Sequence, residues 1–189
     1  MKKRWILASG GSLMLALLTL PFTWERSVAL NSDVRVESAS AAADAAFCDE
    51  ELEPANLDFT IKDMNGESVV LSEHKGSVIL LDFWATWCGP CKIEIPGFVE
   101  LQDKYGDDGL VVLGFSVDDP VERLQPFVDE YKMNYPVLVG LGRDDVQEAF
   151  GPIYGIPTTI VINRDGEICK RHIGFSSKEQ FEKEIKALL

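Results

Sequence analysis

Two cysteines three positions apart, Cys88 and Cys91, have the spacing of a redox-active disulfide. An apolar run over residues 78–84 comes before them, and a helical pattern from about Gly89 to Tyr105 follows. Residues three apart on the first turn of a helix face the same way, so the two sulfur atoms can bond. Unpaired N–H groups at a helix start favour an anion, which lowers the pKa of the Cys88 thiol below its free value of ~8.5. We therefore expect Cys88 to be the nucleophile of thiol-disulfide exchange, and Cys91, one turn inside the helix, to resolve the mixed disulfide.

Metal binding is the alternative use of such a cysteine pair. A zinc site needs further ligands at a matching spacing. The other cysteines, Cys48 and Cys169, are isolated in the sequence, and the only histidines are His74 and His172. We therefore expect no metal site. A chaperone that holds Cu(I) between two thiolates ranks low as an alternative, because no methionine or histidine cluster adjoins the motif.

The elements that must position this pair alternate between strand and helix patterns, which predicts an α/β fold. The run at 78–84 is almost continuously apolar, as expected for a central strand covered on both faces. Asn65-Gly66 predicts the turn of a β-hairpin early in the domain. Further strands are expected at 110–117, 136–139, 158–162 and 167–173, and helices at 120–132, at 144–150 and after Ser177, which forms a capping-box pattern with Gln180. The whole predicts a central mixed β-sheet with helices on both faces and an added N-terminal β-hairpin.

Two acidic residues are placed to exchange protons with the cysteines. Asp82 interrupts the apolar strand six residues before Cys88, and burial there raises the pKa of a carboxyl group. Glu94 follows Cys91 by three positions and so shares its helical face. We expect both carboxyl groups to transfer protons during the exchange. The alternatives are that Asp82 reaches water at the strand edge and that Glu94 is a solvated residue stabilised by the helix dipole.

In these residues the chain resembles the thioredoxin superfamily, and more closely its TlpA/ResA-like, membrane-tethered branch of AhpC/TSA and redoxin-type proteins. The motifs that carry the resemblance are Asp82-Phe83-Trp84-Ala85, Trp87-Cys88-Gly89-Pro90-Cys91-Lys92-Ile93-Glu94-Ile95-Pro96, Gly155-Ile156-Pro157-Thr158 and Asn163-Arg164-Asp165-Gly166. The resemblance covers residues 55 to 189 and implies a thioredoxin fold and an extracytoplasmic thiol-disulfide oxidoreductase whose only redox group is its disulfide. Asp82 departs from the branch, which more often has Asn at this position.

The resemblance also implies a substrate-binding surface and a direction of electron flow. The proline corresponding to Pro157 is cis in this fold and lies against the disulfide, which leaves the backbone of Ile156 to pair with an incoming peptide strand. Trp87, Gly89 and Pro90 complete the expected substrate-binding set, and Gly89-Pro90 resembles the reducing members. We expect the protein to reduce disulfides in partner proteins, as in cytochrome c or copper-centre maturation. A transmembrane thiol donor such as a DsbD/CcdA-like protein would then rereduce it.

Two other redox activities are alternatives to protein-disulfide reduction. A dithiol oxidase would use the same two cysteines in the opposite direction. A thiol peroxidase is disfavoured because Trp84 stands where peroxidases of the hairpin-bearing branch carry proline.

The amino-terminal region has the pattern of an exported chain. Basic residues precede a long uncharged run, so residues 1–24 are expected to be a signal peptide or an N-terminal membrane anchor, with the anchor slightly favoured. Cleavage after Ala29 would instead release a soluble secreted form. Residues 25–47 are expected to be a flexible linker, and residues 48–189 the thioredoxin-like domain on the periplasmic side of the inner membrane. The net charge of −13 argues against a nucleic-acid partner.

Cys48 and Cys169 remain outside the redox pair. In an oxidising compartment two remaining cysteines often bond to each other, and we expect this pair to form a structural disulfide. Closing so long a loop stabilises a fold by up to ~4.7 kcal/mol in the chain-entropy model. The alternative is two separate thiols, one of them buried as a small apolar side chain.

Overall fold

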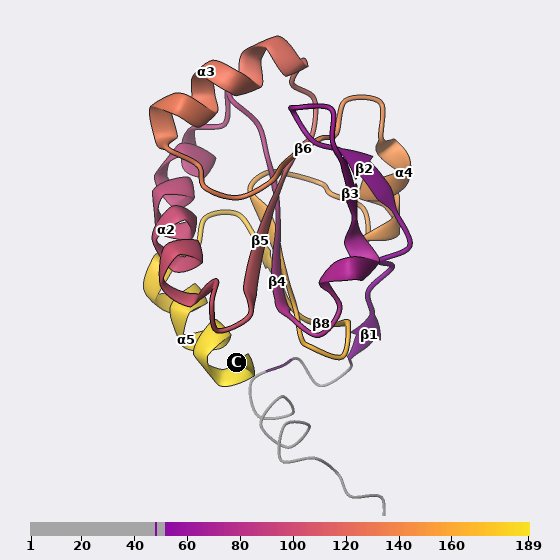
Figure 1. The fold of residues 1–189 in the computed structure, drawn as a ribbon, viewed down its shortest axis with the longest axis vertical. Coiled ribbons are helices and arrows are strands. Elements are labelled where there is room, and N and C mark those ends of the chain that lie inside the picture. Colours follow the sequence, from indigo (N-terminus) through magenta and orange to yellow (C-terminus); the bar gives the residue numbers. More distant parts are fainter. Residues whose placement is uncertain (1–47, 49–51) are drawn as a thin grey trace, which may run out of the picture. The chain divides into compact units, whose positions relative to one another are not determined.

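The computed structural model describes Cys48 and residues 52–189 (Figure 1). The predicted signal or anchor, residues 1–24, lies outside the described residues, as does the predicted linker at 25–47. In the part of the chain that is described, no helix has both the length and the apolar character needed to cross a bilayer.

A six-stranded mixed sheet forms the centre of the domain, in the order β1-β8-β7-β4-β5-β6. The strands are β1 (Glu53–Pro54), β4 (Val78–Trp84), β5 (Leu110–Ser116), β6 (Val137–Val139), β7 (Thr158–Ile162) and β8 (Glu167–Ile173). β4 pairs in parallel with β5 and antiparallel with β7, so it is a central strand, and all seven of its residues are buried. The mixed sheet and the central position of this strand agree with the sequence patterns.

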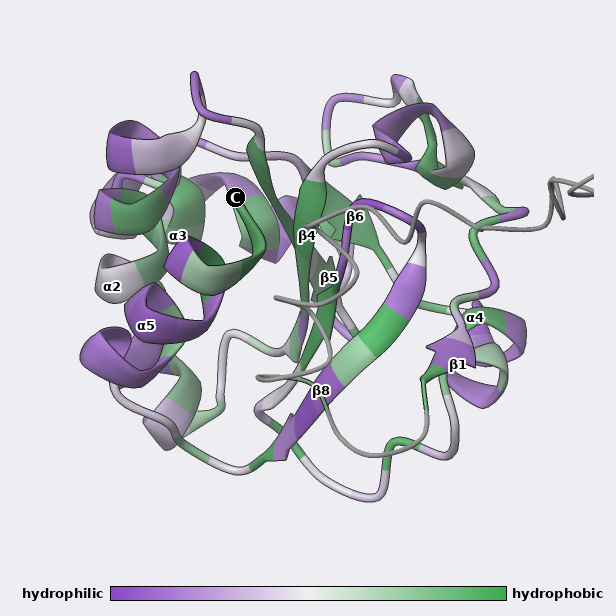
Figure 2. Cartoon of the chain, turned by 90° about the horizontal axis from the view of Figure 1, so that it is seen from below, coloured by the Kyte–Doolittle hydropathy of each residue, from purple (hydrophilic) through white to green (hydrophobic). Residues whose placement is uncertain are grey.

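Helices cover both faces of the sheet. They are α2 (Gly89–Tyr105), α3 (Val121–Tyr131), α4 (Asp144–Ala149) and α5 (Lys178–Leu188). Figure 1 shows α2, α3 and α5 on one side and α4 on the other. Side chains of β4 alternate between two apolar clusters, with Leu80 facing the α2 side and Leu81 the α4 side. Figure 2 shows β4 and β5 in the hydrophobic colour between helices that carry both hydrophilic and hydrophobic residues.

The predicted hairpin is present as a separate two-stranded sheet of β2 (Thr60–Lys62) and β3 (Ser68–Val70), followed by the short 3-10 helix η1 (Leu71–His74). Gly66 in its turn has a φ of 83°, a conformation that glycine adopts without strain. Sequence patterns missed β1, which pairs Glu53 with Ile168 of β8. A two-residue strand ending in proline has no periodicity to detect, and only its distant partner defines it.

The start of α5 differs in part from the expected capping box. The Ser177 side chain accepts a hydrogen bond from the backbone N–H of Gln180 at 3.3 Å, as predicted. The side-chain amide of Gln180, however, donates to Glu184 within the helix at 2.5 Å. In a complete capping box the side-chain oxygen of Gln180 would accept from the backbone N–H of Ser177. The bond to the buried Glu184 carboxylate instead directs this side chain along the helix.

Candidate active site

Cys88 and Cys91 are joined by a disulfide at the start of α2. β4 ends at Trp84, and Cys88 is the N-terminal cap of the helix. The Cys88 sulfur accepts a hydrogen bond from the backbone N–H of Cys91 at 3.2 Å. Gly89 and Pro90 occupy the first two helical positions, where proline loses no needed hydrogen bond. Both cysteines are buried, Cys88 with 3% of its surface exposed and Cys91 with none.

The segment around Ile156 and Pro157 reaches the same edge of the sheet. β7 runs antiparallel to β4, and Thr158 at its start is in register with Phe83 near the end of β4. The Ile156–Pro157 peptide bond is therefore at the end of the sheet where Cys88 follows β4, and it is cis. The carbonyl of Pro157 accepts a hydrogen bond of 2.8 Å from Gly174, which ties this loop to the end of β8.

Asp82 lies in β4, on the face that carries α2, and only 1% of its surface is exposed. One carboxyl oxygen accepts a 3.3 Å hydrogen bond from the hydroxyl of Thr159, and the other has no partner in the described structure. Burial raises the pKa of Asp82 well above its ordinary value, and the nearby Glu94 raises it further. Asp82 therefore stays protonated to a higher pH than an exposed carboxyl group does, which suits proton exchange with a buried thiol.

Glu94 is the second buried carboxyl group, with 4% of its surface exposed. It lies one turn after Cys91 on α2, and Oε1 accepts a 2.9 Å hydrogen bond from the backbone N–H of Ser176. Burial raises the pKa of Glu94 to about 7, although the Ser176 bond and the charge of His172 oppose the rise. The solvated alternative for Glu94 is therefore wrong, because α5 and the loop before it cover this face of α2.

Two further polar groups lie near these carboxyl groups and were missed in the sequence. The Tyr135 hydroxyl and the Trp84 indole N–H are buried without a hydrogen-bond partner in the described structure, like the free oxygens of Asp82 and Glu94. Burial raises the pKa of Tyr135 well above its ordinary value, and the charges of Asp82 and Glu94 add to the rise. A Cβ atom at Gly114, which is in register with Asp82, would lie 2.9 Å from the Trp84 nitrogen and 3.2 Å from the Tyr135 ring. Four polar side chains thus meet in one apolar interior. They come from separate segments of the chain, so no local pattern predicts that they meet.

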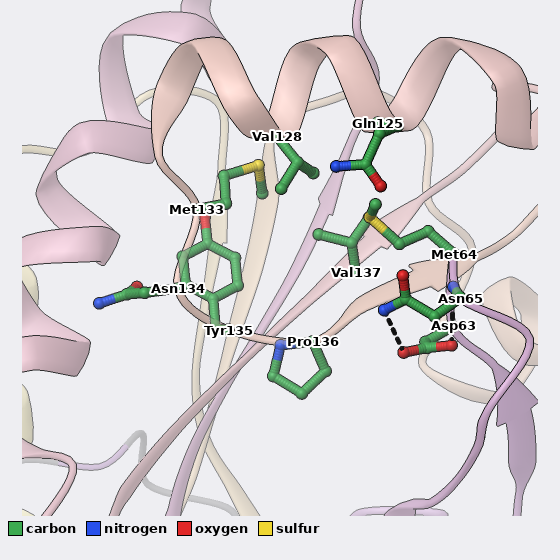
Figure 3. A pocket seen from close by; sticks show the side chains of 10 residues that line it. All are labelled: Asp63, Met64, Asn65, Gln125, Val128, Met133, Asn134, Tyr135, Pro136 and Val137. Carbon is green, nitrogen blue, oxygen red and sulfur yellow. Dashed lines mark hydrogen bonds between the residues drawn. The ribbon is translucent and has the colours of Figure 1, made fainter.

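Tyr135 also lines an open pocket of ≈ 400 Å³ on the surface. Figure 3 shows Tyr135 beside Met133, with Val128 and Gln125 of α3 along one side of the pocket. Asp63 accepts the hydrogen bonds that shape the hairpin turn on the other side, including one of 2.9 Å from the Asn65 backbone. The lining residues include neither active-site cysteine, so this pocket is separate from the disulfide.

Exposed apolar side chains belong to the same segments as the disulfide and the cis proline. Trp87, immediately before Cys88, is 59% exposed, and its indole N–H donates to Asp118 at 2.9 Å. Other exposed apolar residues in these segments are Ile93, Tyr154, Ile173 and Phe175. Ile173 is in register with Thr158, next to the cis bond. An apolar rim of this kind suits contact with a protein segment.

Cys48 and Cys169 form a second disulfide, with their Cα atoms 4.4 Å apart. Cys169 lies near the start of β8, whereas the active-site loop meets the end of that strand at Gly174. The bond joins the segment before β1 to the sheet and is separate from the Cys88–Cys91 site. Among the residues that the structure describes, no group of three or more His, Cys, Asp or Glu side chains is arranged to hold a metal ion.

Comparison with known proteins places this geometry in a family. The model of the AhpC/TSA family matches residues 53–171. The thiol-disulfide oxidoreductase ResA of Halalkalibacterium halodurans is 36% identical over 126 residues, covering 67% of this chain and 70% of that protein. The thioredoxin-like protein YneN of Bacillus subtilis is 32% identical over 130 residues, covering 68% of this chain and 75% of that protein.

A solved structure has the same fold. The thiol:disulfide interchange protein of the thioredoxin family from Chlorobium tepidum TLS superimposes with a TM-score of 0.67 at 28% identity, over 74% of this chain and 98% of that one. The predicted thioredoxin fold is therefore confirmed. The chain belongs to the AhpC/TSA family, within its ResA-like branch of thiol-disulfide oxidoreductases.

Proposed function

We propose that this oxidoreductase reduces disulfides in partner proteins outside the cytoplasm, with the Cys88–Cys91 pair as its only redox group. The observation that carries the proposal is the pairing of a cysteine at a helix N-terminus with two buried carboxyl groups, Asp82 and Glu94. The helix N-terminus makes the Cys88 sulfur nucleophilic, and the two carboxyl groups exchange protons with Cys91.

The reaction starts from the reduced dithiol. The Cys88 thiolate attacks one sulfur of the substrate disulfide, a mixed disulfide forms, and the other substrate sulfur leaves as a thiolate and takes up a proton. Cys91 then loses its proton to Asp82 or Glu94 and attacks the Cys88 sulfur. The second substrate thiolate leaves and is protonated. The substrate has gained two electrons and two protons, and Cys88 and Cys91 are left as the disulfide.

The negative charge of Glu94 favours the reducing direction. A strong oxidant owes its high potential to a stabilised reduced form, usually through a stabilised thiolate. Glu94, with a pKa of about 7, is partly ionised at neutral pH. Its negative charge disfavours a thiolate at Cys91, one turn away on the same helix. We therefore expect a potential nearer to about −270 mV than to about −120 mV.

The substrate surface suits an extended protein segment. Trp87, immediately before Cys88, and Phe175, next to the Gly174 that bonds Pro157, offer exposed apolar contacts. Pro157 has no backbone N–H, and the neighbouring backbone of Ile156 lies just before the start of β7, where an incoming strand can pair with it. Trp87, Gly89 and Pro90 would frame the substrate sulfur.

The amino-terminal pattern and the second disulfide support a proposed extracytoplasmic setting. The run within residues 1–24 supports a tether to the inner membrane with the domain on the periplasmic side, or a secreted form after cleavage. A second disulfide at Cys48–Cys169 suits an oxidising compartment. In that compartment a transmembrane thiol donor of the DsbD/CcdA type would supply electrons. Proteins of cytochrome c or copper-centre maturation are the proposed substrates.

A trapping experiment tests the proposal. Cys91→Ser leaves the attacking sulfur and removes the resolving one, so mixed disulfides should accumulate on Cys88 in the native host. Mass spectrometry of the trapped species identifies the substrate class, with Cys88→Ser as the matched control. Purified protein should also reduce insulin with dithiothreitol as the electron source. No trapped species and no insulin reduction would refute the function.

Dithiol oxidation is the second candidate, and the hydrogen bond from the Cys91 N–H to the Cys88 sulfur favours it. That bond stabilises a thiolate at Cys88 and raises the potential. Equilibration with a glutathione redox buffer decides between the two directions. A potential close to about −120 mV would assign the protein to oxidation.

A further inference from the structure

Glu94 is connected to α5 and β8 through a short chain of polar contacts. Ser176, in the loop before α5, donates its backbone N–H to Glu94 and places its hydroxyl 3.2 Å from Nδ1 of His172. The other ring nitrogen of His172 lies 2.8 Å from Oε2 of Glu184 on α5. Both nitrogens of the histidine are therefore engaged, one by a carboxylate and one by the residue that binds Glu94.

This histidine is well enclosed. Its side chain is 16% exposed, and the Phe181 ring of α5 packs edge-on against it at 4.9 Å. Glu184 is 2% exposed, and Gln180 donates to its other oxygen. No local pattern predicts the contact between His172 and Glu184, because the two residues are twelve positions apart and meet only where α5 packs back against β8.

The charged groups around His172 come from four elements. Glu184 of α5 bonds it, Glu94 of α2 lies beyond Ser176, and Asp82 of β4 bonds Thr159, which is in register with His172. The positive charge of Lys170, two residues earlier on β8, helps to lower the pKa of Glu184.

Arg171, the residue before His172 on β8, faces away from this cluster. Arg171 donates to the backbone of Phe150, which belongs to the apolar cluster of the opposite face of the sheet. The Arg171 guanidinium therefore lies on the other side of the sheet from Glu94 and does not take the place of His172 beside it.

We propose that His172 is a positioning residue of the oxidoreductase: anchored by Glu184, it sets the charge of Glu94 through Ser176. The inference rests on the proposed proton-transfer role of Glu94. In the protonated histidine both ring N–H groups donate, one to the Glu184 carboxylate and one to the Ser176 hydroxyl. When the ring is protonated, its positive charge lies behind Ser176, on the side from which Ser176 donates to Glu94.

The electrostatic consequence has a definite sign. A cation near a buried carboxyl group favours the ionised form and lowers its pKa. The charge of His172 has this effect on Glu94, against the larger effect of burial. Removal of the cation should therefore raise the pKa of Glu94 above its value of about 7. Nearby opposite charges change a pKa by about 1 to 3, and we expect the low end, about 1, because the Ser176 N–H remains.

The test is a carbon-13 NMR titration of the Glu94 carboxyl group in the oxidised full chain, assigned by its loss in Glu94→Gln. His172→Gln keeps polar contacts but carries no charge, and the Glu94 midpoint should rise by about one pH unit, a tenfold change in proton affinity. His74→Gln is the matched control, since His74 lies on η1, and it should leave the midpoint unchanged.

A second variant keeps the inference testable if His172→Gln does not fold. Glu184→Gln leaves the imidazole without its carboxylate, which disfavours the histidine cation, so the Glu94 midpoint should again rise. An unchanged Glu94 midpoint in the folded variant would overturn the inference. The titration needs no substrate, so a protein that fails to reduce insulin and still shows the rise would refute the proposed function alone.

Discussion

Glu94→Gln should change how the stability of the oxidised protein depends on pH. The pKa of Glu94 rises from 4.5 to about 7 on folding. Below pH 4.5 the group is protonated in both states and has no effect. As the pH rises from 4.5 to about 7, the unfolded chain ionises freely while the native carboxyl group stays protonated, so native stability falls.

The size of the effect follows from the two pKa values. A tenfold difference in proton affinity corresponds to about 1.4 kcal/mol, so the loss is at most about 3.5 kcal/mol and is complete above the native pKa. Glutamine does not titrate, so its variant lacks this loss. The new amide adds a cost where the Oε2 atom has no partner, but that cost does not depend on pH. The difference in unfolding free energy between the two proteins should therefore shift by about 3.5 kcal/mol in favour of the variant across this range.

Urea unfolding of both oxidised proteins at a series of pH values measures this difference. Glu130→Gln serves as the matched control, because Glu130 is exposed on α3, and its curve should run parallel to that of the natural chain. Parallel curves for Glu94→Gln as well would refute the burial of an ionisable carboxyl group at this position.

Three further changes separate the roles of the remaining groups. Asp82→Asn should slow resolution of the mixed disulfide by ~10²-fold, the usual loss when a general acid–base group is removed. Quenched-flow detection of the mixed disulfide measures this rate, and an unchanged rate would exclude Asp82 from proton transfer. Trp87→Ala should raise KM for a protein disulfide and leave the reaction with a small disulfide unchanged. Steady-state kinetics on both substrates measures this, and equal effects on both would contradict a docking role for Trp87. The Cys48→Ser, Cys169→Ser double variant should lose up to roughly 5 kcal/mol of unfolding free energy in urea. The variant should still reduce insulin at temperatures where the variant stays folded. Lost activity in the folded variant would show that this bond supports the active site.

The parts of the fold that sequence patterns predicted are those with a strong local signal. The apolar run of β4 and the Cys-x-x-Cys at the start of α2 each define an element without reference to distant residues. The direction of the Asp82 pKa also follows locally, because any carboxyl group in such a strand is desolvated. β1 was missed because it has only two residues and is defined by its pairing with β8.

The missing parts of the site arise from tertiary packing. Tyr135 and Trp84 have the pattern of core aromatic residues, yet both lie beside Gly114, which is in register with Asp82, and each has a buried polar atom without a hydrogen-bond partner in the described structure. His172 meets Glu184 only because α5 packs beside the end of β8. Such convergence depends on how elements meet in space, and no local pattern carries that information.

The proposed reaction depends above all on the acidity of the Cys88 thiol. The most direct measurement is the ultraviolet absorbance of the thiolate as a function of pH in Cys91→Ala, in which the Cys48–Cys169 bond leaves Cys88 as the single titrating thiol. The helix N-terminus predicts a midpoint clearly below the ~8.5 of a free cysteine. A midpoint at or above that value would contradict the assignment of Cys88 as the attacking sulfur.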